Sequence, residues 1–228
     1  MASPESEPGA VETEGEYNPL DYHNLTVNLV RELMARGPYA LPPATRVAGA
    51  GVYALFYTGD LPSYGRYRSP DSSRPIYVGK AIPRGGRTGL HSGAAALGTP
   101  LYARLTQHSR SIEAATNLRL VDFRCRFLVV TPLWITMAER FLFEEFQPLW
   151  NVKLSGFGIH GPGSGRNQQE ISWWDALHPG RSFAALLRQT RTEKDAQTLV
   201  SDWSRLQEEH PETARRVATE AALDEADK

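Results

Sequence analysis

Residue types that phosphodiester hydrolysis requires occur in order along this chain. Tyrosine and glycine stand in mirrored order in two short apolar segments, Gly51-Val52-Tyr53 and Tyr77-Val78-Gly79. Arg104 and His108 follow, one helical turn apart, and Glu139 comes next. Attack of water on phosphorus needs a base, a cation for the developing charge and a carboxylate that can hold a metal ion. The set contains a candidate for each task.

The candidate base is Tyr53. A free tyrosine has a pKa of about 10, so it needs activation. Lys80 is the cation that we expect to lower this pKa, and His108 could relay or accept the proton. Tyr77 would orient the attacking water or hold a phosphate oxygen. The alternative for both tyrosines is simple packing against a sheet.

Charge neutralisation falls to Arg104 and to one carboxylate. A guanidinium can fork onto two oxygens of the pentavalent phosphorus. Glu139 is a hard oxygen ligand that suits one Mg²⁺ ion, with Mn²⁺ as a possible substitute. Glu144 and Glu145 are rival acids, which we assign to the solvated face of the same helix. Asn151 would hydrogen-bond to the phosphate or to Glu139, or be a plain turn residue. One obvious carboxylate ligand does not support a two-metal mechanism.

A small sheet and two helices are needed to bring these residues together. Aromatic and β-branched content, or alternation of apolar with polar residues, predicts three strands. Thr99-Pro100 is a helix start, and the helix that follows places Arg104 and His108 on its flank. Thr136 opens the helix that carries Glu139. The predicted strands are residues 51–58, 75–80 and 118–131.

Charge divides the chain, which has a net charge of −1, into three parts. Residues 1–24 hold six acids and no lysine or arginine, and residues 192–228 hold ten acids and five bases. Residues 25–191 therefore carry a net charge of +10, and eighteen of their twenty bases are arginine. Arginine forks onto phosphate and guanine edges, so a nucleic-acid partner fits this basic body. An ordinary solvated surface would give the same count.

The composition excludes several other classes. Hydrophobic residues make up 41% of the chain, and no apolar run has the length of a membrane span. The acidic N-terminal segment is not a secretory signal. Cys125 is the single cysteine, which excludes an internal disulfide and a cysteine-based zinc site. We expect a cytoplasmic protein with no membrane partner.

Two further motifs follow Asn151. A glycine-rich tract runs from Gly156 to Arg166, and His178-Pro179-Gly180-Arg181 comes after it. Glycine permits close approach of the backbone to a ligand, to DNA or to the domain's own body. Specificity requires contacts to base edges, because phosphate contacts carry no sequence information. The candidates for guanine contacts are Arg166 and Arg181, and those for phosphate contacts are Arg84, Arg87 and Lys153.

As an ordered set, these residues resemble the GIY-YIG nucleases. Valine replaces isoleucine in each of the two tripeptides, and Pro148-Leu149-Trp150-Asn151 ends the Glu139 helix as that superfamily requires. The pair Arg104 and His108, the glycine-rich tract and His178-Pro179-Gly180-Arg181 resemble the type II restriction endonucleases that cut the palindrome CCGCGG. The likeness spans roughly residues 40–185.

This resemblance implies an α+β fold with a small three-stranded antiparallel sheet flanked by helices, the GIY-YIG nuclease fold. It implies double-stranded DNA as substrate, a homodimer that matches the palindrome, and a cognate DNA methyltransferase as companion. We divide the chain into a disordered acidic leader, an endonuclease domain with DNA-recognition insertions, and a helical, acidic C-terminal tail. Their bounds are residues 1–22, 23–190 and 191–228.

Two alternatives remain open. One is a repair or structure-specific nickase on the same fold that acts as a monomer, which palindrome-dependent cleavage would distinguish. The other is a non-catalytic DNA-binding module on the same scaffold. The complete set of Tyr53, Tyr77, Arg104 and Glu139 argues against it, because a binding protein needs no metal carboxylate beside a phosphate site.

Overall fold

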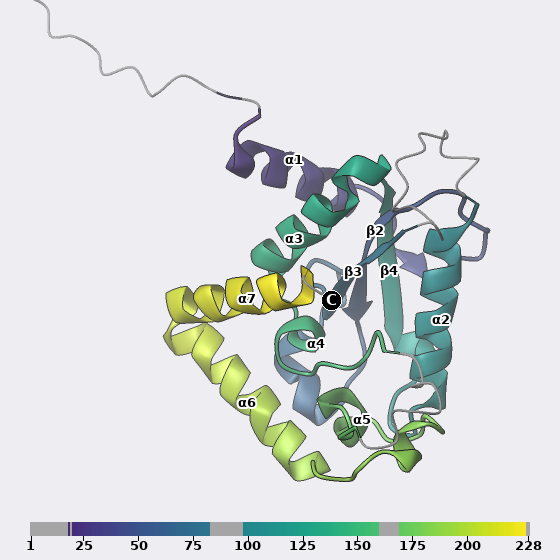
Figure 1. The fold of residues 1–228 in the computed structure, drawn as a ribbon, viewed down its shortest axis with the longest axis vertical. Helices are drawn as coiled ribbons and strands as arrows, with labels where there is room; N and C mark the ends of the chain where they lie inside the picture. The colour runs from purple at the N-terminus through teal and green to yellow at the C-terminus, as the bar shows by residue number, and fades with distance from the viewer. Residues whose placement is uncertain (1–17, 19, 83–97, 160–168, 227–228) are drawn as a thin grey trace, which may run out of the picture.

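The computed structural model describes residues 18, 20–82, 98–159 and 169–226 (Figure 1). At its centre lies an antiparallel sheet of four strands in the order β1-β4-β2-β3. The strands are β1 (Tyr39–Ala40), β2 (Gly51–Tyr57), β3 (Tyr77–Ala81) and β4 (Phe123–Val129). The α+β class agrees with the sequence prediction, but the predicted count of three strands is wrong. The missed strand, β1, is only two residues long, too short for any alternation to appear in the sequence.

The central strand β2 is buried on both faces. Its alternation is the predicted one, with Tyr53, Leu55 and Tyr57 in one hydrophobic cluster and Val52, Ala54 and Phe56 in the other. Successive side chains of a strand point to opposite faces of the sheet, so each face supplies one cluster. Tyr53 pairs with Gly79 of β3 on one side and with Phe127 of β4 on the other.

Helices cover both faces of the sheet (Figure 1). On the Val52 face pack α1 (Tyr22–Met34), α3 (Ile135–Phe146) and α7 (Pro211–Ala226). On the Tyr53 face pack α2 (Pro100–Ala114), α4 (Leu149–Val152), α5 (Trp173–Leu177) and α6 (Glu193–Glu209). None of the described helices is both long and apolar enough to cross a membrane.

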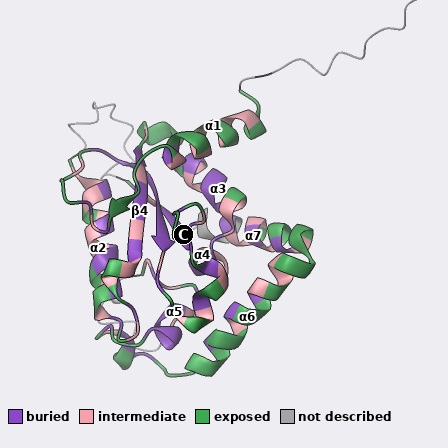
Figure 2. Ribbon diagram, turned by 180° about the vertical axis from the view of Figure 1, so that it is seen from behind, coloured by how far each residue is buried: buried purple, intermediate pink, exposed green. Residues whose placement is uncertain are grey.

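The C-terminal helices are part of the body. Residues 184–186 form a short 3₁₀ turn, and α6 begins at Glu193. Thr192 fixes this start, because its side chain and that of Asp195 form a reciprocal capping box. Trp203 of α6 is buried in the Tyr53 cluster, and Figure 2 shows buried residues on the inward sides of both helices. The helices α6 and α7 therefore pack on the domain, and the division of the chain at residue 191 stays a prediction.

Two segments bear on other predictions. The stretch between β2 and β3 contains a 3₁₀ helix, η1 (Pro62–Tyr67), that buries Tyr64 and Tyr67. Residues 1–17 and 19 lie outside the described part of the chain, so the disordered leader stays a prediction.

Candidate active site

Tyr53 and His108 form the centre of the site. Tyr53 projects from the middle of β2 and His108 from α2, and the tyrosine hydroxyl lies 2.6 Å from His108 Nε2, within hydrogen-bonding distance. Both side chains are almost fully buried. His108 thus faces the core, whereas the sequence predicts it on the helix flank. The helical stripe of Leu101, Leu105 and Ile112 is buried as expected, and His108 lies beside it.

Aromatic rings enclose this pair. Phe157 stacks on the His108 ring, with a centroid distance of 4.5 Å and an interplanar angle of 14°. The Tyr77 ring meets both of these rings edge-on, at 5.3 Å from His108 and 5.0 Å from Phe157. An imidazole held between rings has one orientation, so its nitrogen stays directed at the Tyr53 hydroxyl.

Two glycines are required by this packing. A Cβ atom at Gly79 would lie 2.5 Å from the Tyr53 hydroxyl oxygen, and one at Gly158 would lie 2.9 Å from the Tyr77 hydroxyl oxygen and 3.2 Å from Arg104 Nη2. The glycine of the second tripeptide therefore leaves room for the first tyrosine. Of the partners considered for the glycine-rich tract, the structure shows the domain's own body at Gly158.

Arg104 is the cation of the site. It projects from α2 and donates a hydrogen bond from Nη1 to Gln107 Oε1 at 3.1 Å. Burial lowers the pKa of the Arg104 guanidinium, but the adjacent hydroxyls of Tyr53 and Tyr77 more than offset this and hold the pKa above its usual value. Arg104 is thus charged and directed at both tyrosines.

Burial raises the pKa of Tyr53 to about 12, and only in part does the charge and hydrogen bonding of Arg104 counteract it. The expectation that a cation lowers this pKa below its usual value is therefore wrong for the described state, and the neighbouring cation is Arg104, not Lys80. Tyr53 is protonated at neutral pH, so it needs a proton acceptor before it can act as a base. His108 is in place for that role.

Lys80 and Glu139 form an ion pair at the rim of the site. Lys80 Nζ of β3 lies 2.6 Å from Glu139 Oε2 of α3, and both side chains are partly buried. The Glu139 charge is close enough to contribute to the raised pKa of Tyr53. Glu139 thus acts electrostatically on Tyr53, and its place in the catalytic set stays a prediction.

The donor set fits one hard cation. No group of three or more His, Cys, Asp or Glu side chains gathers into a metal site among the described residues. Mg²⁺ is commonly held by one or two carboxylates, with water and substrate phosphate completing its shell. Glu139 can supply one such oxygen, and its present pairing with Lys80 shows that the carboxylate accommodates a positive charge.

The structure shows a structural role for Asn151. Its Oδ1 accepts a hydrogen bond from Val78 N at 2.8 Å, and its Nδ2 donates one to Val78 O at 2.9 Å. Val78 lies in β3, the edge strand of the sheet. Asn151 therefore continues the pairing of β3 and holds the strand that carries Tyr77 and Lys80. Its predicted bond to phosphate or to Glu139 stays a prediction.

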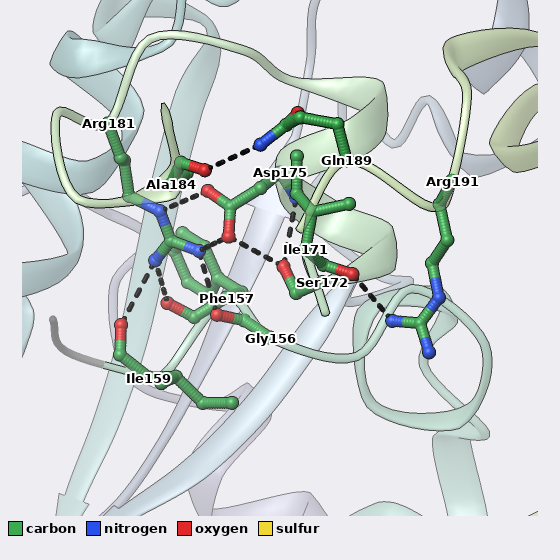
Figure 3. Close-up of polar contacts among 10 residues, drawn as sticks. All are labelled: Gly156, Phe157, Ile159, Ile171, Ser172, Asp175, Arg181, Ala184, Gln189 and Arg191. Carbon is green, nitrogen blue, oxygen red and sulfur yellow. Dashed lines mark hydrogen bonds and ion pairs between the residues drawn. The ribbon is translucent and has the colours of Figure 1, made fainter. Parts of the chain in front are cut away.

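The structure buries Arg181, a predicted guanine contact. Its side chain is 4% exposed and hydrogen-bonds to Asp175 and to backbone carbonyls of the segment 156–159 (Figure 3). Every N–H group of the guanidinium has an acceptor, which leaves none for guanine. The structure speaks against Arg181 as a base contact.

The other predicted DNA contacts are Lys153, Arg84, Arg87 and Arg166. Lys153 follows α4 and places Nζ 5.0 Å from the centroid of the Trp203 ring, on the α6 side of the molecule. Its phosphate contact stays a prediction. Arg84, Arg87 and Arg166 lie outside the described residues.

Tyr64 and His178 form a second buried tyrosine–histidine pair. The Tyr64 hydroxyl hydrogen-bonds to His178 Nε2 and accepts a hydrogen bond from Trp150 Nε1 at 2.8 Å. His178 Nδ1 donates to Asn117 Oδ1 at 2.8 Å. Burial, reinforced by the charge of Arg181, lowers the pKa of His178 to about 3. This pair is neutral and fully satisfied within the core, so we regard it as structural.

Sequence reasoning missed three contributors to the site. Gln107 lies three positions after Arg104, a spacing that predicts contact on a helix. Phe157 stands between two glycines, which marks a close approach of its backbone but not its stacking on His108. No local pattern in the sequence indicates Asp175, because its partner Arg181 lies six positions further on, outside the helix α5 that carries Asp175.

A family model described as the Eco29kI GIY-YIG domain matches residues 45–204, well over half of the chain. No curated protein matches the sequence. The matched span contains every residue of the site, from Tyr53 on β2 to Glu139 on α3. It also includes α6 up to Ser204, in agreement with the packing of that helix on the body. The chain belongs to the Eco29kI GIY-YIG family, a family of restriction endonucleases that hydrolyse DNA.

Proposed function

We propose that this protein is a Mg²⁺-dependent type II restriction endonuclease that cuts double-stranded DNA at a GC-rich palindrome, with CCGCGG as the expected site. One observation carries the proposal most strongly. A buried tyrosine–histidine hydrogen bond of 2.6 Å lies beside an arginine and a carboxylate, the set that hydrolysis of a phosphodiester needs.

The proton path follows from the raised pKa of Tyr53. A neutral tyrosine can take a proton from water only if it releases its own, and His108 Nε2 is the acceptor within reach. We assign the pair as a relay, in which water gives its proton to the Tyr53 oxygen as the Tyr53 proton passes to His108. Tyr77, next to Arg104, would orient the water or a phosphate oxygen.

Charge on the phosphorane is the second requirement. Arg104 would donate to its equatorial oxygens, and losing one such donor typically costs roughly 10²–10³ in rate. Glu139 would hold a Mg²⁺ ion, which supplies further charge neutralisation at the scissile phosphate and the leaving oxygen. Lys80 would then leave Glu139 and be available to the phosphate.

A palindromic target predicts a two-fold homodimer, in which each copy cuts one strand. A methyltransferase of the same specificity would protect host DNA. The alternatives are a monomeric repair or structure-specific nickase and a non-catalytic DNA-binding module. The Tyr53–His108 pair differs from the structural Tyr64–His178 pair because the charges of Arg104 and Glu139 act on Tyr53, and this combination favours an enzyme over a binding module.

Cleavage of a supercoiled plasmid that carries one CCGCGG sequence tests the proposal. The wild type in Mg²⁺ should give full-length linear DNA, and EDTA should prevent it. Glu139→Gln should abolish cutting while DNA binding persists. Glu145→Gln is the matched control, since Glu145 is an exposed acid on the same helix. Nicked circles alone would favour the nickase, and binding without cutting would favour the binding module.

A further inference from the structure

Arg181 and Asp175 form a buried ion pair with an unusually complete set of contacts (Figure 3). Arg181 Nε and Nη2 each lie 2.6 Å from one oxygen of the Asp175 carboxylate. The remaining donors reach three backbone carbonyls of one short segment, those of Gly156 at 2.9 Å and of Phe157 and Ile159 at 3.1 Å. All five guanidinium N–H groups are therefore used.

The segment held by Arg181 forms one wall of the candidate active site. Phe157 stacks on the ring of His108. Gly158 lies so close to Tyr77 and Arg104 that a Cβ atom would come within 2.9 Å and 3.2 Å of their side chains. The position of this backbone therefore determines how much room the three catalytic side chains have.

The pair is itself anchored to the rest of the fold. Asp175 accepts a hydrogen bond from Ser172 Oγ at 2.7 Å, and Ser172 begins α5. At the other end, Gly180 packs on the final carbonyl of α2, where a Cβ atom would lie 1.8 Å from Ala114 O. The helix α2 carries Arg104 and His108. The pair thus connects the end of that helix with the wall that faces its catalytic residues.

We propose that Arg181 and Asp175 are positioning residues for DNA cleavage: they hold the backbone of Gly156–Ile159 so that Phe157 and Gly158 keep His108, Tyr77 and Arg104 in the reactive arrangement. This inference rests on the proposed endonuclease function. A buried ion pair adds little stability compared with apolar residues of the same volume. Its five directed bonds do fix a backbone segment, which apolar packing would not do.

Lysine cannot replace Arg181 in this role. Its ammonium group donates from a single nitrogen and cannot reach three carbonyls and both carboxylate oxygens at once. Arg181→Lys keeps the buried positive charge beside Asp175 but releases the wall. We expect it to lower the cleavage rate constant of bound DNA by roughly 10- to 100-fold, the scale of a misplacement of about 1 Å.

The matched control is Arg191→Lys. Arg191 projects from the same region (Figure 3) and donates to Ile171 O at 2.7 Å, with its guanidinium 4.6 Å from the Trp173 ring. In the described part of the chain Arg191 makes no hydrogen bond or ion pair with residues 156–159. Its replacement changes the same residue type and breaks a comparable carbonyl contact, so we expect less than about a twofold change in rate.

The experiment measures single-turnover cleavage with the DNA fully bound, normalised to the concentration of DNA-binding protein, together with the DNA Kd in Ca²⁺ and the urea midpoint. A merely structural role lowers the midpoint and the active fraction but leaves the rate constant of bound DNA unchanged. The positioning role predicts a lower rate constant with a Kd within about threefold of the wild type. An unchanged rate constant for Arg181→Lys, or an equal loss in Arg191→Lys, would overturn the inference.

Should Arg181→Lys fail to fold, Gly158→Ala carries the test, because the added methyl displaces the wall from Tyr77 without touching the ion pair. The same loss of rate at unchanged Kd is expected, and a rate equal to the wild type would refute the wall's role. A wild-type protein that cuts no DNA would refute the proposed function itself, and the inference with it.

Discussion

Lowering the pH from 7 to 5 should destabilise the folded protein through one side chain, His178. It is 0% exposed. Its Nδ1 donates to Asn117 Oδ1, so its Nε2 is left to accept from the Tyr64 hydroxyl, and the charged Arg181 is near. Burial and this neighbouring charge lower the pKa of His178 to about 3. Protonation of His178 Nε2 therefore removes the acceptor for the Tyr64 hydroxyl and places an unpaired positive charge in the core.

The magnitude follows from linkage. In the unfolded chain a histidine has a pKa of about 6.5, so between pH 6.5 and 3 the unfolded state binds more protons than the folded one. The stability contribution is fully present above pH 6.5 and falls as the pH drops. A difference of about 3.5 pKa units corresponds to about 5 kcal/mol below pH 3, of which about 2 kcal/mol is already lost at pH 5.

Urea unfolding followed by tryptophan fluorescence at pH 7 and pH 5 measures this effect. His178→Gln should be less stable than the wild type at pH 7. Between pH 7 and pH 5, however, its free energy of unfolding should fall by about 2 kcal/mol less than that of the wild type. His210→Gln is the control, since His210 is exposed at the end of α6, and it should keep the wild-type pH dependence. An equal loss in His178→Gln and the wild type would refute the reasoning.

Three further predictions concern the site and its support. Tyr53→Phe removes the hydroxyl but keeps the ring, and should slow cleavage roughly 10²- to 10⁴-fold in single-turnover assays while the free energy of unfolding changes by only about 1 kcal/mol. Gly79→Ala places a methyl group 2.5 Å from the Tyr53 hydroxyl oxygen and should also suppress cleavage, whereas Gly65→Ala, with nothing within 4 Å of the added atom, should not. Asn151→Ala removes both bonds to Val78 and should lower the free energy of unfolding by about 1–3 kcal/mol in urea titrations; an unchanged midpoint would contradict its structural role.

The periodic parts of the fold could be predicted from the sequence. Alternation along residues 51–57 determines which side chains of β2 face α2, and that places Tyr53 toward the helix of Arg104 and His108. Helical spacing then brings Arg104 and His108 to the same region as the tyrosines. The periodic pattern of one strand or helix is therefore enough to predict which of its residues face the neighbouring element.

The remaining site residues depend on contacts between distant parts of the chain. Asn151 bonds to a strand 73 positions away, and a turn asparagine looks the same in the sequence whether or not it has such a partner. Arg181 directly follows a glycine, and an arginine beside a glycine is typical of a DNA contact. Only the fold shows that Asp175 and three carbonyls take up its donors. The burial of His108 under Phe157 is a tertiary contact of the same kind.

The central claim is that one site, built on the Tyr53–His108 pair and Glu139, hydrolyses both strands of DNA at a single palindrome. Digestion of unmethylated phage DNA by the purified protein in Mg²⁺, with sequencing of the fragment ends, tests it directly, and Glu139→Gln serves as the control. We predict that all ends fall at one GC-rich palindrome and that the control produces none. Ends at random positions, or the same ends from the Glu139→Gln protein, would contradict the account.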